Sequence, residues 1–291
     1  MISASLVKEL REKSGAGMLD CKTALEANNG DIEASLDWLR EKGFAKAAKK
    51  ASRIAAEGLA KIFVDGNKAI IIEVNSETDF VSKNQEFIDL IDTIGNTAIK
   101  NDVKDVEEVL SLPYEEKTIN DLMVAKISKI GEKLSIRRLT VLNKTDNQTF
   151  GVYSHNGGKI VVLTIVENGN EEVARDVAMQ SAAMKPQYIK TEDIPNDVLD
   201  HERSVLKEQS MNEGKPEEIA LKMVEGRIRK FYQEVVLLNQ SFIKDGDITI
   251  EKHLQNNKAT LIDMVRYEVG EGMEKRNDNF AEEVMNQAKG E

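Results

Sequence analysis

The sequence predicts an α+β protein in which two related units of hairpin and helix follow a small unit of three helices. β-branched runs flank Asp65-Gly66-Asn67, a helical pattern follows at about 84–100, and the same order of elements returns over 150–184. Residues 3–42 carry three short helical patterns, and residues 196–238 carry two longer ones. These patterns indicate two core subdomains with small antiparallel sheets and an inserted antiparallel helical hairpin of coiled-coil type.

The first 43 residues predict the three-helix module. Ser3 is a candidate N-cap of the first helix, and Asn28-Asn29-Gly30 is a typical left-handed end of the second. Asp31 caps a third helix, which we expect to end at Gly43. Residues 44–58, rich in Ala and Lys, predict a helical linker whose charge marks a solvated face rather than a nucleic-acid site.

Residues 59–145 form the first predicted core subdomain. A turn dipeptide between β-branched runs is a strong hairpin signal. The second strand run leads into a hinge, residues 75–84, which places Phe80 among polar residues at the start of a helix. Such a Phe is either packed inside its own core or exposed as an anchor for a partner, and residue statistics favour the core. A strand over residues 134–142 closes the subdomain.

The second core subdomain repeats this plan over residues 146–185 and 239–272. A strand, the turn His155-Asn156-Gly157-Gly158, a second strand and a helix follow one another. The loop that corresponds to the hinge, residues 167–170, has no aromatic residue. The repeated scaffold therefore does not require Phe80, which weakens the prediction that it is buried.

Residues 186–238 predict the inserted hairpin, with helices at about 196–213 and 217–238. Apolar residues of the second helix step by three and four, a coiled-coil seam formed by Leu221, Val224, Ile228, Phe231 and Val235. The first helix shows a weaker seam of Val198, His201 and Val205. A short helix near 250–256 and a strand over 261–269 follow, and residues 273–291 form a C-terminal module with a helix near 280–288.

Composition restricts the class of function. Of the 291 residues, 31% are charged and the net charge is −11, which argues against a nucleic-acid backbone as the main partner. No apolar run reaches the length of a membrane span. The single cysteine, Cys21, excludes an intramolecular disulfide and suits a reducing cytoplasm.

Signals of enzymatic chemistry are weak. The stretch from Gly151 to Lys159 lacks the spacing of a phosphate loop, and Ile160 stands where such a loop has Ser or Thr. His201-Glu202 is not completed by a second histidine, since residue 205 is Val. We therefore predict no catalytic residues, no metal site and no cofactor, and interpret the chain as an interaction protein.

Five ordered motifs resemble the elongation factor Ts family, the guanine-nucleotide exchange factors for elongation factor Tu. They are Leu6-Val7-Lys8-Glu9-Leu10-Arg11 with Gly15-Ala16-Gly17-Met18-Leu19-Asp20-Cys21-Lys22, Glu73-Val74-Asn75 with Thr78-Asp79-Phe80-Val81, Lys129-Ile130-Gly131-Glu132 with Arg137-Arg138, Met223-Val224-Glu225-Gly226-Arg227, and Arg266-Tyr267-Glu268-Val269-Gly270-Glu271-Gly272. The resemblance spans essentially the whole chain.

The resemblance implies an N-terminal module similar to ubiquitin-associated domains and a set of contacts to elongation factor Tu. The family's nucleotide-release loop corresponds to Thr78, Asp79, Phe80 and Val81, with Phe80 entering the partner near its magnesium and phosphate site. The implied core contacts are Ile130, Gly131 and His155, and those of the N-terminal module are Lys8, Arg11, Met18, Leu19 and Lys22. Leu19 stands where the family commonly has Met, and the turn after His155 is one residue longer than in some relatives.

The resemblance also implies a cytoplasmic protein without direct nucleotide binding, nucleic-acid partner or membrane contact, and it leaves open a weak homodimer through the core or the hairpin. Asp79 either contacts the partner or only caps its helix. Three other classes remain as alternatives: an adaptor or chaperone without exchange activity, an enzyme with an unrecognised site, and a structural protein that self-associates through the seam of residues 217–238.

Overall fold

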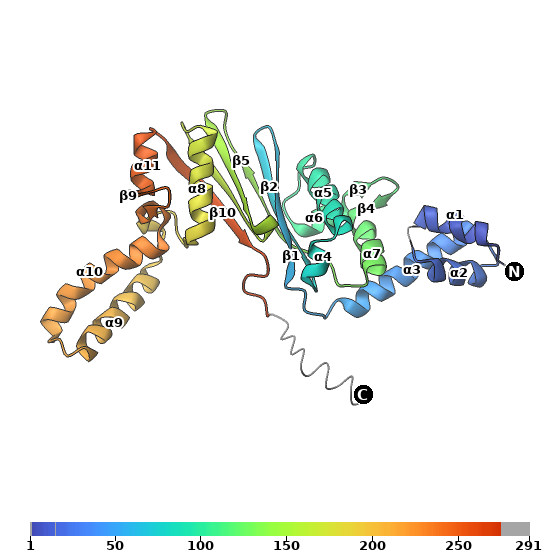
Figure 1. Cartoon of the computed structure of the whole chain (residues 1–291), viewed down its shortest axis with the longest axis horizontal. Coiled ribbons are helices and arrows are strands. Elements are labelled where there is room, and N and C mark those ends of the chain that lie inside the picture. Colours follow the sequence, from blue (N-terminus) through green and yellow to red (C-terminus); the bar gives the residue numbers. More distant parts are fainter. Residues whose placement is uncertain (1, 15, 275–291) are drawn as a thin grey trace. The chain divides into compact units, whose positions relative to one another are not determined.

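The computed structural model describes residues 2–14 and 16–274 and confirms the mixed α+β fold with small antiparallel sheets (Figure 1). The described residues divide into two compact units: the first comprises those up to Leu142 together with residues 268–274, and the second comprises Asn143–Tyr267. The predicted helix near 280–288 lies outside the described residues. Among the helices of the described ranges, none combines the length and apolarity that crossing a membrane demands.

The first unit begins with three helices: α1 (Ala4–Ser14), α2 (Met18–Ala27) and α3 (Ile32–Lys50). The predicted caps are confirmed, because the Leu6 N–H donates to Ser3 Oγ at 3.2 Å and the Ala34 N–H donates to Asp31 Oδ1 at 3.0 Å. The small core of the three helices consists of Val7, Leu10, Cys21, Ala24 and Leu25, with further half-buried apolar residues around it.

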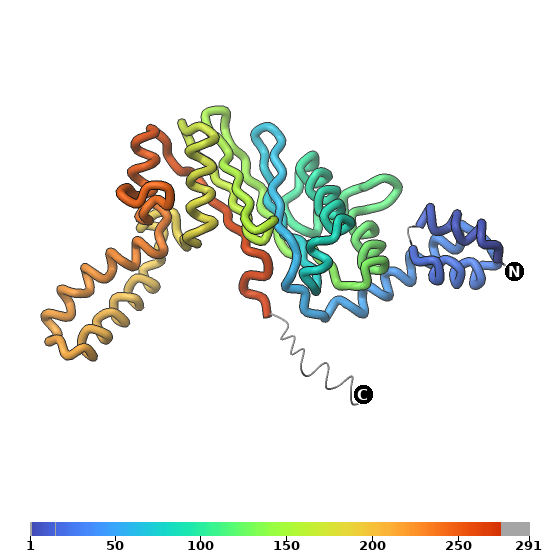
Figure 2. The backbone as a smooth tube through the Cα atoms, viewed as in Figure 1, coloured from blue at the N-terminus to red at the C-terminus, as the bar shows by residue number. Residues whose placement is uncertain are grey.

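The prediction that the third helix ends at Gly43 is wrong. Helix α3 continues to Lys50, so that only residues 44–50 of the predicted linker helix (44–58) are helical, as the last part of α3, and residues 51–56 are not helical (Figure 2). A Cβ on the buried Gly43 would lie 3.3 Å from Cγ1 of Val124 on α7 (Ile119–Ile130). The glycine therefore allows two helices to approach closely, and this tertiary contact outweighs its low helix propensity.

A three-stranded sheet in the order β1-β2-β5 follows, built from β1 (Glu57–Asp65), β2 (Lys68–Ser76) and β5 (Ser135–Asn143). Asp65 pairs with Lys68 and Gly66 has a φ of 56°, which confirms the two-residue hairpin turn. Helix α5 (Gln85–Ile99) buries one face against β2 because its apolar residues recur every three to four positions: Phe87, Leu90, Ile91, Ile94 and Ala98.

Shorter elements complete the first unit. They are α4 (Asp79–Ser82), α6 (Val106–Ser111), β3 (Pro113–Tyr114) and β4 (Lys117–Thr118), which precede α7. Helix α7 ends at Gly131, which is its left-handed C-cap with a φ of 87°. The small β3-β4 hairpin is not recognisable in the sequence, since each strand has only two residues.

The second unit repeats the hairpin and helix as predicted. Its sheet has the order β10-β7-β6, from β6 (Gln148–His155), β7 (Ile160–Glu167) and β10 (Thr260–Glu268), with a 3₁₀ turn (Asn156–Gly158) between β6 and β7. Helix α8 (Glu171–Met184) packs on β6 and β7. A Cβ on Gly151 would meet the Ala174 carbonyl oxygen at 2.1 Å, so only glycine allows this approach of strand and helix.

The inserted hairpin consists of α9 (Asn196–Asn212) and α10 (Glu217–Val235), which pack against each other. Val224, Ile228 and Val235 are buried as predicted, whereas Leu221 is 52% exposed and Ala220 is buried in its place. The prediction for Leu221 is therefore wrong. His201 is exposed, as is Val198, so they do not form the seam of α9.

The remaining elements of the second unit join the hairpin to the sheet: 3₁₀ turns at Thr191–Asp193 and Leu237–Asn239, β8 (Ser241–Phe242), β9 (Asp245–Thr249) and the predicted α11 (Ile250–Asn256). Buried Gln180 of α8 holds this junction. Its Nε2 donates to Gln240 Oε1 at 3.2 Å and to the Ser241 carbonyl oxygen at 3.1 Å, and its Oε1 accepts the Ile243 N–H at 2.9 Å.

Candidate functional site

The Phe80 loop, residues 77–83, leads from the end of β2 into the single-turn helix α4. Thr78 caps this helix, since its Oγ1 accepts the Val81 N–H at 3.4 Å. Val81 packs against the first core and Ser82 is buried, whereas the Phe80 side chain is 82% exposed. The turn is thus fixed by its inner face, and Phe80 is an exposed residue rather than a core residue.

Glu132 holds the start of this loop from the other side. Its Oε2 accepts the N–H groups of Glu77 and Thr78, each at 3.0 Å, and its Oε1 accepts the Thr78 hydroxyl at 2.6 Å. Glu77 in turn accepts the Lys133 N–H at 2.6 Å and pairs with Arg53 at 3.2 Å. The loop therefore donates hydrogen bonds to Glu132 and accepts one from Lys133, so each segment holds the other.

Ile130 and Gly131, two predicted contact residues, directly precede Glu132. Ile130 is half-buried against the first core, and the Gly131 carbonyl oxygen accepts a hydrogen bond from Lys50 Nζ at 2.6 Å. The structure thus brings these residues and the Phe80 loop together through Glu132. Sequence reasoning did not assign Glu132 a role, because its partners lie 54 and 55 positions away.

Asp79 is not the helix cap, so the capping alternative is wrong: Thr78 fills that role. The Asp79 carboxylate instead accepts a hydrogen bond from Lys83 Nζ at 2.6 Å. This pair lies on the exposed side of α4, next to Phe80 in sequence.

The predicted contact residues of the N-terminal helices are all exposed: Lys8, Arg11, Met18, Leu19 and Lys22. Met18 is 56% exposed and Leu19 is 77% exposed, at the first turn of α2. Exposed apolar side chains of this size beside cationic ones are typical of an interaction surface.

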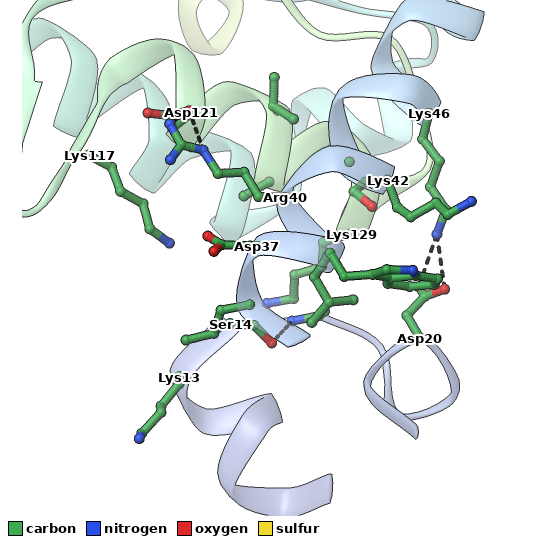
Figure 3. Close-up of a pocket in the computed structure, with 18 of the residues that line it drawn as sticks. Lys13, Ser14, Asp20, Asp37, Arg40, Lys42, Lys46, Lys117, Asp121 and Lys129 are labelled. Carbon is green, nitrogen blue, oxygen red and sulfur yellow. Dashed lines mark hydrogen bonds and ion pairs between the residues drawn. The ribbon is translucent and has the colours of Figure 1, made fainter. Parts of the chain in front are cut away.

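A cleft of about 590 Å³ lies between the N-terminal helices and α7 (Figure 3). Charged groups that line it pair with each other: Arg40 donates to Asp121 Oδ1 at 2.8 Å, and Lys46 contacts Asp20 at 3.0 Å. Burial opposes ionisation of Asp121, but hydrogen bonds from Thr118 and Arg40 prevail and lower its pKa. The first pair attaches α3 to α7, and the second joins α3 to α2, so both pairs have a structural role within the first unit.

His155, the remaining predicted contact, belongs to the second unit. It is exposed at the end of β6, where its ring stacks with Tyr153 at a centroid distance of 6.4 Å.

Glu73 forms a second cluster that sequence reasoning missed. This Glu73 cluster joins the fully buried carboxylate of β2 to Arg137 Nη1 at 3.0 Å, to Arg138 Nε at 2.6 Å and to the Gly270 N–H at 2.9 Å. Burial raises the pKa of Glu73, but the hydrogen bonds from Gly270, Arg138 and Arg137 outweigh it and lower the pKa overall. Three of the five motifs therefore meet in one structural cluster.

The Glu73 cluster also bears on the predicted domain boundary at residue 272. That prediction groups residues 239–272 with the second subdomain. The described residues from Glu268 to Gly272 instead belong to the first unit, because Gly270 is bound to Glu73 and the Glu268 carbonyl oxygen accepts a hydrogen bond from Arg138. The other parts of the predicted division stay a prediction.

The family model described as elongation factor TS matches residues 77–271. The matched range includes the Phe80 loop, Ile130, Gly131 and His155, and it ends within the segment that binds Glu73.

Among residues 2–14 and 16–274, no group of three or more His, Cys, Asp or Glu side chains has the arrangement of a metal site.

Proposed function

The chain belongs to the elongation factor TS family, and from this we propose that it binds GDP-bound elongation factor Tu and promotes GDP release by inserting Phe80 near the partner's magnesium and phosphate site. GTP then reloads the emptied site. The observation that supports this proposal is the exposure of Phe80, 82%, on a turn that the protein's own core fixes from behind. An apolar side chain held away from its core is available for burial in a partner.

Exchange of this kind is a matter of binding rather than bond making. If the factor lowers the partner's affinity for GDP, then GDP lowers the partner's affinity for the factor by the same amount, because the two affinities are linked. Shifting an equilibrium about ten-thousand-fold requires about 5.5 kcal/mol of differential affinity. Burial of one Phe supplies about 1.5–3 kcal/mol, so other contacts must supply the rest.

We assign that additional affinity to two further sets of residues. Lys8, Arg11, Met18, Leu19 and Lys22 of the N-terminal helices form one set, and Ile130, Gly131 and His155 form the other. All of them except the half-buried Ile130 are exposed, which supports a role in holding the partner while Phe80 distorts its nucleotide site. In this division Phe80 governs the release rate, and the other contacts govern affinity.

The test is stopped-flow release of fluorescent GDP from elongation factor Tu by the Phe80→Ala variant. We expect release at saturating factor to slow at least tenfold, while binding to nucleotide-free partner is largely retained. Phe44→Ala is a matched control, since Phe44 is 38% exposed on α3 and should leave release unchanged. Wild-type release by Phe80→Ala would exclude the insertion mechanism.

The N-terminal contacts have a separate test. Arg11→Ala and Lys22→Ala should weaken the complex, measured by titration calorimetry with nucleotide-free partner, and should leave the release rate at saturation almost unchanged. Normal affinity in both variants would argue against this surface. Adding excess GDP and magnesium should dissociate the wild-type complex, as linkage demands.

A further inference from the structure

We propose that Glu132 is a positioning residue for nucleotide exchange: its carboxylate fixes the Phe80 loop to the end of α7, so that Phe80 is already directed outward before the partner arrives. This inference rests on the proposed function of Phe80 and adds the residue through which its geometry is set.

The first argument is the number and kind of hydrogen bonds. Both carboxylate oxygens of Glu132 are used, one by two successive backbone N–H groups and the other by the Thr78 hydroxyl. Hydrogen bonds to an ionised carboxylate are stronger than those between neutral groups. Three such bonds to Glu77 and Thr78 restrict the chain in the two residues before α4.

The second argument is that the β1-β2 ladder supplies no acceptor for the backbone N–H groups of Glu77 and Thr78. The ladder between β1 and β2 ends where Ser76 pairs with Glu57, so the next two N–H groups lie beyond the sheet. Helix α4 has four residues, and a single helical turn is not stable by itself. Glu132 therefore provides the hydrogen-bond acceptor that a neighbouring strand supplies earlier in β2.

The third argument concerns the position of Glu132 itself. It follows the left-handed cap Gly131 and precedes the buried Leu134, while Ile127 of α7 is packed in the core. Its backbone is thus restrained on both sides. Because Ile130 and Gly131 are the adjacent residues, the same connection holds two predicted contact elements, the end of α7 and the Phe80 loop, in one fixed arrangement.

The consequence is that Glu132 acts through Phe80 and not by touching the partner's nucleotide site. Without its carboxylate, the loop start loses its acceptor, and α4 samples other orientations in which Phe80 points elsewhere. The factor would still bind through its other contacts, but a smaller fraction of complexes would have Phe80 inserted. The maximal rate of GDP release should therefore fall more than the affinity.

The experiment is a double-mutant cycle of Glu132→Ala and Phe80→Ala, with GDP release from elongation factor Tu measured at saturating factor. We expect Glu132→Ala to slow release at least tenfold in the wild-type background and less than twofold in the Phe80→Ala background. Glu86→Ala is the control, since Glu86 pairs with Lys126 and Lys129 of α7 at 2.7 Å and should change release less than twofold in both backgrounds.

A second readout is independent of the partner. Amide hydrogen exchange of Glu77 and Thr78 should accelerate at least tenfold in Glu132→Ala, while the amides of α5 keep their protection. Glu132→Gln, which keeps the size and one acceptor oxygen, provides a milder variant that should show both effects at reduced size.

Equal slowing by Glu132→Ala in both backgrounds, or no slowing in either, would overturn the positioning role, as would unchanged exchange of the Glu77 and Thr78 amides. Failure of the proposed function shows itself separately, as normal GDP release by Phe80→Ala alone.

Discussion

Replacing Glu73 by Gln tests how far the first unit depends on one buried charge. The substitution keeps the volume of the side chain but removes its charge and turns one acceptor oxygen into an NH₂ donor. That donor faces the guanidinium groups of Arg137 and Arg138, which are themselves donors only. The Gly270 N–H loses a charged acceptor at the same time.

The expected loss in the free energy of unfolding follows from how deeply the ion pairs of Glu73 are buried. The Glu73 side chain has no exposed surface, while those of Arg137 and Arg138 are 23% and 29% exposed. Removing one partner of a buried ion pair typically costs about 3–5 kcal/mol. Because water reaches part of both arginines, we expect the lower end, a loss of about 3 kcal/mol in the free energy of unfolding.

The assay is urea unfolding followed by circular dichroism, with Glu86→Gln as the matched control. Glu86 also pairs with two cationic residues, but its side chain is 26% exposed, and pairs open to solvent contribute about 1 kcal/mol or less. The reasoning is refuted if the two variants lose the same free energy, because burial would then not determine the contribution of the carboxylate.

The same pair of proteins has a defined pH dependence. The pKa of Glu73 is lower in the folded protein than its ordinary value of about 4.3, so the charged form is stabilised by folding. The stability difference between wild type and Glu73→Gln should be complete above about pH 5 and should shrink as the pH falls through the lowered pKa. A stability difference that grows on acidification would contradict a lowered pKa of Glu73 in the folded protein.

Three further predictions concern the second unit, all measured by thermal unfolding. Gly151→Ala should destabilise by at least about 2 kcal/mol, because the new Cβ would lie 2.1 Å from a backbone oxygen; an unchanged midpoint would refute the close approach. Gly226→Ala, at an open position of α10, should stabilise by about 0.5–1 kcal/mol, and a loss would reveal a contact that the structure lacks. Ile228→Ala should cost about 2–5 kcal/mol, since Ile228 is only 2% exposed in the hairpin seam; a loss below 1 kcal/mol would mean that the seam contributes little.

Features that depend on neighbouring residues were predictable from the sequence. The turn at Gly66, the caps Ser3 and Asp31, and the repeated order of strand and helix all follow from local rules of backbone geometry and periodicity. The orientation of Phe80 was open from residue patterns alone, and comparing the two copies of the plan correctly weakened the buried alternative.

Features decided by distant contacts were not predictable. Gly43 has the propensity of a helix end, but its contact with Val124 of α7 makes it an interior position of α3. On α10 the first buried position of the seam is Ala220 rather than Leu221, four residues before the buried Val224 instead of three, and apolar spacing does not distinguish these two steps. Glu132 and Glu73 acquire their roles from residues more than fifty positions away, and no local pattern marks such partners.

The hydrogen bond between Glu73 and the Gly270 N–H spans 197 positions of the chain, and this has a consequence for biosynthesis. At about 5–20 residues per second, the ribosome adds Gly270 roughly 10–40 s after Glu73. Until then the carboxylate has its two arginines but lacks the backbone donor, and the entire second unit is synthesised in the interval. The first unit therefore completes its folding last although it is made first, and a nascent chain arrested before Gly270 should expose the Glu73 cluster to proteases and chaperones.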